Sequence, residues 1–77
     1  MKKYLYLTSN RHVICVFAKQ KPNQKNTPPS GTWVVNEFIN GEWLMPCFPE
    51  IMWETLRKFI YIGEIKWQKA EIDIMSN

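Results

Sequence analysis

The dipeptide Asn40-Gly41 constrains the fold of this chain more than any other feature of its sequence. Asn and Gly tolerate the positive φ angles that a type I′ turn requires, and this turn joins neighbouring strands of a β-hairpin. Apolar and aromatic residues flank the dipeptide on both sides. A two-residue loop places Phe38 opposite Trp43, and we expect this aromatic pair to fix the register of the hairpin. Pro46 should then end regular pairing.

A second hairpin is predicted at the start of the chain. Residues 3–8 and 12–18 are rich in β-branched and aromatic residues, and a short polar segment separates them. Both faces of this hairpin are apolar, so we expect it to be central in the sheet and covered on both sides. With an even-numbered loop, one face carries Leu5, Leu7, Ile14 and Val16, and the other carries Tyr4, Tyr6, Cys15 and Phe17.

Residues 19–31 contain no aliphatic or aromatic side chain and include three prolines. Proline disfavours the helix interior and favours an extended, solvated backbone. Because connections of this length are uncommon in small domains, we expect a long mobile loop.

The segment after Pro49 has the pattern of a helix. Met52, Leu56, Phe59 and Ile60 follow helical spacing, and Gly63 suits the position just past a helix end. The sequence therefore predicts a helix over residues 50–61, followed by a strand region between residues 65 and 74. Residues 1–77 are expected to form one α+β domain: a small antiparallel sheet of about five strands with one helix packed on it, in the order β-β-β-β-α-β.

The net positive charge of the chain is confined to its N-terminal part. Residues 1–31 hold six Lys and Arg and no acidic residue, whereas residues 32–77 hold four basic and seven acidic residues. Hairpin pairing brings the two ends of the first hairpin together, so five lysines should gather at one pole. They are Lys2, Lys3, Lys19, Lys21 and Lys25.

Three interpretations of this lysine cluster compete. The lysines could simply keep the loop solvated, bind nucleic-acid phosphates, or attract an acidic protein surface. Binding of single strands would require exposed aromatic residues beside the lysines. Tyr4 and Tyr6 are the candidates, and we expect both to be buried because their strand face is otherwise apolar.

The chain offers few groups for catalysis or metal binding. A zinc site usually needs three or four His or Cys ligands, and only His12, Cys15 and Cys47 are present. His12 and Cys15 are an odd number of residues apart, so on a strand they point to opposite faces. We therefore expect no enzyme activity, no catalytic residue, no metal and no cofactor.

Four tryptophans are a high load for 77 residues, and so small a core can hardly hide all of them. We expect at least one to be exposed, with Trp43 and Trp53 as the candidate binding residues. The predicted function is that of a small non-catalytic binding protein: an inhibitor, regulator or accessory subunit with a protein partner. The alternative is a nucleic-acid-binding module that uses the lysine cluster. We expect a cytoplasmic location without membrane contact, and self-association is left open.

Overall fold

The computed structural model describes residues 1–46 and 49–65. These residues form a mostly antiparallel sheet with one short helical turn. The strands are β1 (Lys2–Leu7), β2 (Val13–Ala18), β3 (Thr32–Ile39), β4 (Glu42–Leu44), β5 (Glu50–Met52) and β6 (Ile60–Ile65). The helix α1 (Trp53–Leu56) connects β5 to β6.

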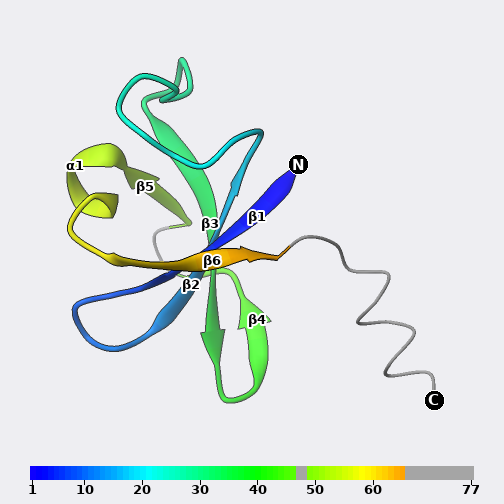
Figure 1. Ribbon diagram of the computed structural model, residues 1–77. Helices are drawn as coiled ribbons and strands as arrows, with labels where there is room; N and C mark the ends of the chain where they lie inside the picture. The colour runs from blue at the N-terminus through cyan, green and yellow to red at the C-terminus, as the bar shows by residue number, and fades with distance from the viewer. Residues whose placement is uncertain (47–48, 66–77) are drawn as a thin grey trace.

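The order of strands in the sheet is β4-β3-β2-β1-β6, and β5 also pairs with β3. The long strand β3 therefore binds β2 along one edge and binds β4 and β5 along the other. The register of β1 and β6 shifts between Leu5 and Tyr6, which marks a β-bulge. A bulge increases the local twist of a strand. In Figure 1, β6 accordingly runs across the direction of the other long strands.

The β3–β4 hairpin is confirmed as predicted. Asn40 and Gly41 have φ angles of 51° and 84°, as a type I′ turn requires. Phe38 lies opposite Trp43, and the centroids of the two rings are 5.0 Å apart. The local turn chemistry thus determines the register here.

The N-terminal hairpin is confirmed, but the predicted pairing of its side chains is wrong. The loop between the paired residues Leu7 and Val13 has five residues, an odd number. Arg11 adopts a φ of 65°, and the Thr8 amide donates a hydrogen bond of 2.8 Å to the carbonyl of His12. This is the geometry of a three-residue turn with a left-handed last residue.

A change of one residue in register moves every side chain to the other face. Tyr4 therefore pairs with Val16 and Tyr6 with Ile14, whereas Leu5 pairs with Cys15. The hairpin is central in the sheet, with β3 on one side and β6 on the other.

The helix predicted over residues 50–61 is reduced to the single turn of α1, and the domain is essentially all-β rather than α+β. Residues 50–52 pair with β3 as β5, and residues from Ile60 onward pair with β1 as β6. Helical spacing is a weak preference, and the free edges of β3 and β1 outweigh it by offering hydrogen-bond partners to β-branched and aromatic residues. Pro49 precedes β5 and Gly63 lies inside β6, so neither limits a helix. The predicted final strand begins earlier than expected, and its part beyond residue 65 lies outside the described residues.

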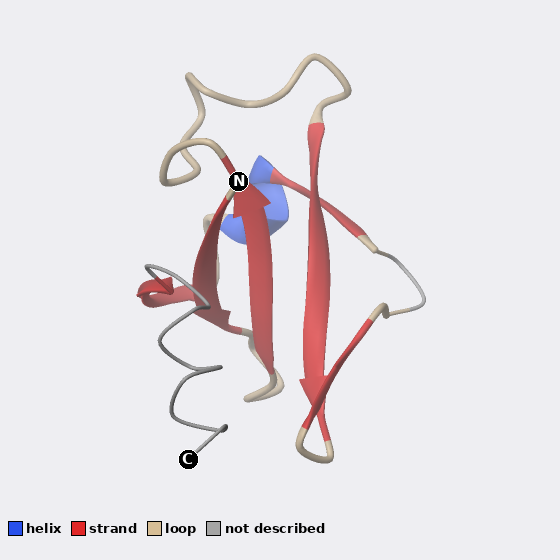
Figure 2. Cartoon of the chain, turned by 90° about the vertical axis from the view of Figure 1, so that its right-hand side faces the viewer, coloured by secondary structure: helices blue, strands red, loops and turns tan. Residues whose placement is uncertain are grey.

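The hydrophobic core lies on one face of the sheet, which we call the inner face. Its buried residues are Tyr4, Tyr6, Ile14, Val16, Ala18, Trp33, Val35 and Leu56. Leu56 comes from α1 and is fully buried, and Trp53 packs edge-on against Trp33 with 6.3 Å between the ring centroids. Pro22 of the 19–31 connection is also buried. Figures 1 and 2 show α1 toward the same end of the molecule as this connection.

Candidate functional site

The opposite, outer face of the sheet carries an unbroken row of apolar side chains. Successive pairings place one apolar residue from each of five strands side by side. This outer row consists of Trp43, Phe38, Val13, Leu7 and Ile60. Trp43 is 41% exposed, Phe38 43% and Ile60 63%, while the two middle residues are half-buried.

Among the described elements, none packs across the outer row, because the one helical turn contributes to the core on the inner face. The hairpin that was expected to be covered on both sides is therefore covered on one side by the residues that the structure describes. Contiguous exposed apolar residues on a small protein mark an interaction site more often than they mark ordinary surface.

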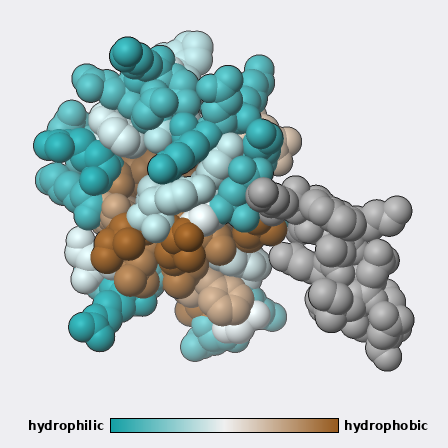
Figure 3. Space-filling model, in the orientation of Figure 1, coloured by the Kyte–Doolittle hydropathy of each residue, from teal (hydrophilic) through white to brown (hydrophobic). Residues whose placement is uncertain are grey.

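Hydrophobic residues also gather along β6. Ile60, Tyr61 and Ile62 are all exposed. In Figure 3, a hydrophobic band crosses the middle of the molecule at the height where Figure 1 places β6, with hydrophilic surface above it.

Three lysines of the predicted cluster, Lys2, Lys3 and Lys19, lie at the same end of the molecule. Lys2 pairs with Ala18 and Lys3 with Phe17, which places both beside Lys19. The start of β1 and the 19–31 connection lie at the same end in Figures 1 and 2. Four of the five lysines are exposed, and Lys3 is half-buried with its Nζ 6.0 Å from the Phe17 ring centroid.

Lys21 is held differently from the other four. Its Nζ lies 4.1 Å from the centroid of the Tyr61 ring on β6, a cation–π contact. Tyr61 in turn contacts Tyr6 edge-on, with a centroid separation of 5.3 Å. The 19–31 connection therefore reaches across to β6, which sequence reasoning did not predict.

The tyrosines under this contact are confirmed as buried. Tyr4 is 3% exposed and Tyr6 is 4% exposed. Burial, together with the neighbouring Tyr61 and Tyr4, raises the pKa of Tyr6 to about 12. Burial also raises the pKa of Tyr4, with a smaller contribution from the carboxylate of Glu64. Neither ring is accessible for stacking against a nucleobase.

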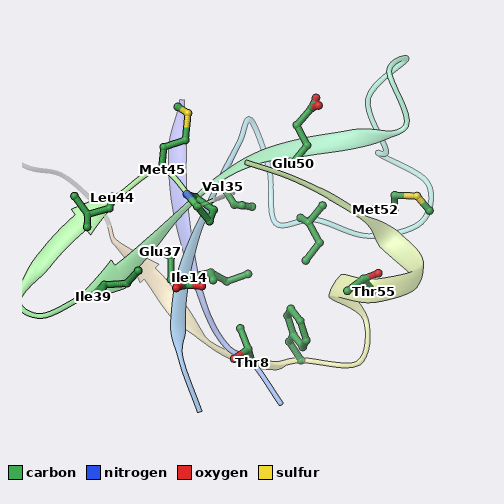
Figure 4. A pocket seen from close by; sticks show the side chains of 13 residues that line it. Thr8, Ile14, Val35, Glu37, Ile39, Leu44, Met45, Glu50, Met52 and Thr55 are labelled. Atoms are coloured by element: carbon green, nitrogen blue, oxygen red, sulfur yellow. The ribbon is translucent and has the colours of Figure 1, made fainter. Parts of the chain in front are cut away.

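A hollow of about 670 Å³ opens on the inner face between β4 and α1 (Figure 4). Its walls are mainly aliphatic, and of the residues that line it only Glu37 and Glu50 ionise. The Glu37 Oε2 lies 3.5 Å from the Nδ1 of His12. The polar side chains that line the hollow are the carboxylates of Glu37 and Glu50 and the hydroxyls of Thr8 and Thr55.

The separation of His12 from Cys15 holds in the structure. Glu37, the contact of His12, pairs with Ile14 and so lies on the inner face, whereas Cys15 lies on the outer face. Cys15 is buried, and burial raises the pKa of its thiol despite the opposing influence of Lys3. A buried thiol with a raised pKa is a poor nucleophile. Within the described ranges, no three His, Cys, Asp or Glu residues lie close enough together to hold a metal ion, and Cys47 lies outside them.

The two candidate tryptophans differ. Trp43 is exposed and belongs to the outer row, which confirms that at least one tryptophan reaches the surface. Trp53 is half-buried against the core and is a packing residue of α1. Sequence reasoning missed Ile60 and Tyr61 because both were assigned to a helix.

Comparison with known proteins gives no relative from which a role could be taken. No family model matches the chain, and no curated protein or solved structure matches it. In the part of the chain that the structure describes, no helix is long and apolar enough to cross a membrane.

Proposed function

We propose that this protein is a small non-catalytic binding domain, an inhibitor, regulator or accessory subunit, that docks on another protein through the outer row. The observation that carries the proposal is the alignment of five apolar side chains from five strands on a sheet face that none of the described elements covers. Trp43 and Phe38 contribute most to the exposed aromatic area at one end of the row.

These two aromatic residues are suited to be binding hot spots. Their rings already touch in the free protein, and a type I′ turn holds the hairpin that carries them. Binding therefore loses little side-chain freedom at this point, which increases the net affinity. Tryptophan and other large aromatic residues dominate the energetics of many protein interfaces.

The decisive experiment compares two double variants that are matched in exposure and charge. Phe38→Lys with Trp43→Lys changes the outer row, and Leu44→Lys with Met45→Lys changes exposed residues beside the inner hollow. A partner is captured from the native host and purified, and its affinity is measured by calorimetry. We expect the outer-row variant to bind about tenfold more weakly or worse, a loss of about 1.4 kcal/mol. The proposal is contradicted if the partner binds the outer-row variant as tightly as the wild type. It is also contradicted if the Leu44→Lys, Met45→Lys variant loses more affinity than the outer-row variant.

One observation favours a second function, binding of single-stranded nucleic acid. Tyr61 is exposed and lies beside a lysine, which is the combination of aromatic ring and cation that nucleic-acid grooves use. However, the ammonium group of Lys21 occupies a face of the Tyr61 ring that a base would need for stacking. The outer row also carries no positive charge.

A salt titration with a fluorescent oligothymidine separates the two functions. We expect no binding at micromolar protein even in low salt. Micromolar affinity that falls steeply as salt is raised would show counterion release from phosphates. That result would replace the protein-partner proposal with the nucleic-acid one.

A further inference from the structure

We propose that the free edge of β6 binds an extended acidic segment of a partner protein, which adds to the sheet as a further antiparallel or parallel strand. This inference rests on the proposed function in that the ligand is a protein. It concerns a second surface that adjoins the outer row: Ile60 belongs to both, and Leu7 of the outer row also lines a hollow beside the β6 edge.

The first support is the state of the edge itself. β6 ends the sheet order and, among the described strands, pairs only with β1. Ile60 is 63% exposed and Ile62 is 52% exposed on this strand. An edge strand presents unpaired N–H and C=O groups, which are a template for another strand. Proteins usually protect such edges, and exposed aliphatic residues on this one leave it open to pairing.

The second support is the pair of hollows that flank the strand. Ile60 lines one of about 480 Å³ together with Leu7 and Lys58. Tyr61 lines another of about 180 Å³ together with Tyr6 and Lys21. Successive residues of a strand point to opposite faces, so adjacent Ile60 and Tyr61 serve opposite sides of the edge. In strand addition, the backbone gives affinity, and pockets for alternate side chains give specificity.

The third support is the charge around these hollows. Arg11 and Lys58 line the larger one, and Lys21 and Arg57 line the smaller one. The cation–π contact fixes the Lys21 ammonium beside β6, whereas Arg57 is shared with Glu54 at 3.4 Å. Glu64 is the one acidic residue within β6. A complementary strand therefore carries both acidic and apolar residues on each of its faces, so that its carboxylates approach the cations of both hollows.

The test uses a synthetic probe and the full chain. The probe is a fluorescent peptide of about ten residues with the repeat Val-Val-Glu-Glu, which puts valine and glutamate on both faces of an extended strand and spans a strand of ordinary length. Its control replaces every glutamate with lysine. Fluorescence anisotropy should show saturable binding of the acidic peptide and none of the basic peptide.

Two matched charge variants locate the site. Lys21→Glu with Lys58→Glu changes one cation in each flanking hollow, and we expect the affinity for the acidic peptide to fall about tenfold. Lys19→Glu with Lys25→Glu makes the same change in net charge on residues that line neither hollow. The affinity of that control variant for the acidic peptide should fall about twofold or less, since exposed charges are screened over a Debye length. Equal losses in the two variants would overturn the proposal in favour of general attraction.

Backbone pairing is tested by hydrogen exchange and by N-methylation. In the free protein, the β6 amides that do not face β1 should exchange rapidly, and the acidic peptide should protect them. Of two peptides N-methylated at either odd or even residues, one should lose binding because it lacks the donors that pair with β6. Strand addition is overturned if every β6 amide exchanges slowly without the peptide. It is also overturned if both N-methylated peptides bind as tightly as the unmethylated one, or if oligothymidine displaces the peptide.

The outer-row variant Phe38→Lys with Trp43→Lys should bind the acidic peptide normally. If no peptide binds while a purified partner still requires Phe38 and Trp43, the β6 proposal fails and the proposed function stands. If the peptide binds and the purified partner has the same affinity for the outer-row variant and the wild type, the proposed function fails and the β6 proposal stands.

Discussion

Replacing Leu56 with alanine should lower the free energy of unfolding by about 3 kcal/mol, within the range measured for buried leucines. Leu56 is fully buried and is the one residue of α1 that belongs to the core cluster. Its side chain belongs to the same buried cluster as Tyr4, Tyr6 and Trp33. A domain of this size has only about 5–10 kcal/mol of stability to lose. The melting temperature should therefore fall by roughly 15 °C in a thermal unfolding experiment.

Met52→Ala is the matched control for this prediction. Helical spacing places Met52 and Leu56 in one buried stripe, whereas in the structure Met52 belongs to β5 and is 52% exposed. We expect this variant to lose about 1 kcal/mol or less, because little apolar surface is removed from the core. Comparable losses for the two variants in urea denaturation would contradict the one-turn helix.

The protein should lose stability between about pH 10 and pH 12 through the titration of Tyr6. The folded-state pKa is raised to about 12 from the ordinary value of 10.0. The unfolded chain therefore releases the phenolic proton first, and deprotonation favours unfolding throughout this window. The stabilising contribution is fully present below pH 10 and is lost as the pH rises toward 12. Two pKa units correspond to about 2–3 kcal/mol of stability.

Urea denaturation at several pH values between 8 and 12 measures this loss. The wild type and Tyr6→Phe share every other ionisable group, so the informative quantity is the difference between the two proteins. Phenylalanine keeps the ring but has no proton to release, and we expect a shallower decline of stability with pH. Parallel declines in the two proteins would show that Tyr6 contributes nothing to the alkaline transition.

Local chemistry explains which parts of the fold are predictable from the sequence. Asn40 and Gly41 specify their turn directly, so the pairing of Phe38 with Trp43 follows. The first hairpin has no such dipeptide, and its register depends on the positive φ of Arg11, a residue type without a strong preference for it. An error of one residue in the loop length therefore put the side chains of β1 on the wrong faces relative to those of β2.

The helix was mispredicted for a different reason. Residues 50–61 have helical spacing, but their conformation depends on the edges of β3 and β1, which are far away in the sequence. Pairing of Ile60 with Leu7 joins residues that no local pattern connects. Tertiary pairing therefore decided between helix and strand here.

The same limit applies to the candidate sites. The lysine cluster was predictable because one hairpin brings its ends together. The outer row was not, because it needs four separate registers to be correct at once. Trp43 was a candidate because four tryptophans are more than so small a core can hide, whereas Tyr61 and Ile60 become candidates only when β6 is known to be a strand.

The pairing of β1 with β6 also affects how the chain folds during synthesis. Of the described strands, β1 is the first to leave the ribosome and β6 is the last, so one edge of β1 stays without this partner until residue 65 has emerged. Closing contacts between such distant residues makes folding slow. Until then, the apolar strand β1 exposes an edge to other nascent chains, which favours aggregation. The bulged pairing of β1 with β6, whose other edge is the proposed binding edge, thus also sets an interval in which the unfinished protein is exposed to aggregation.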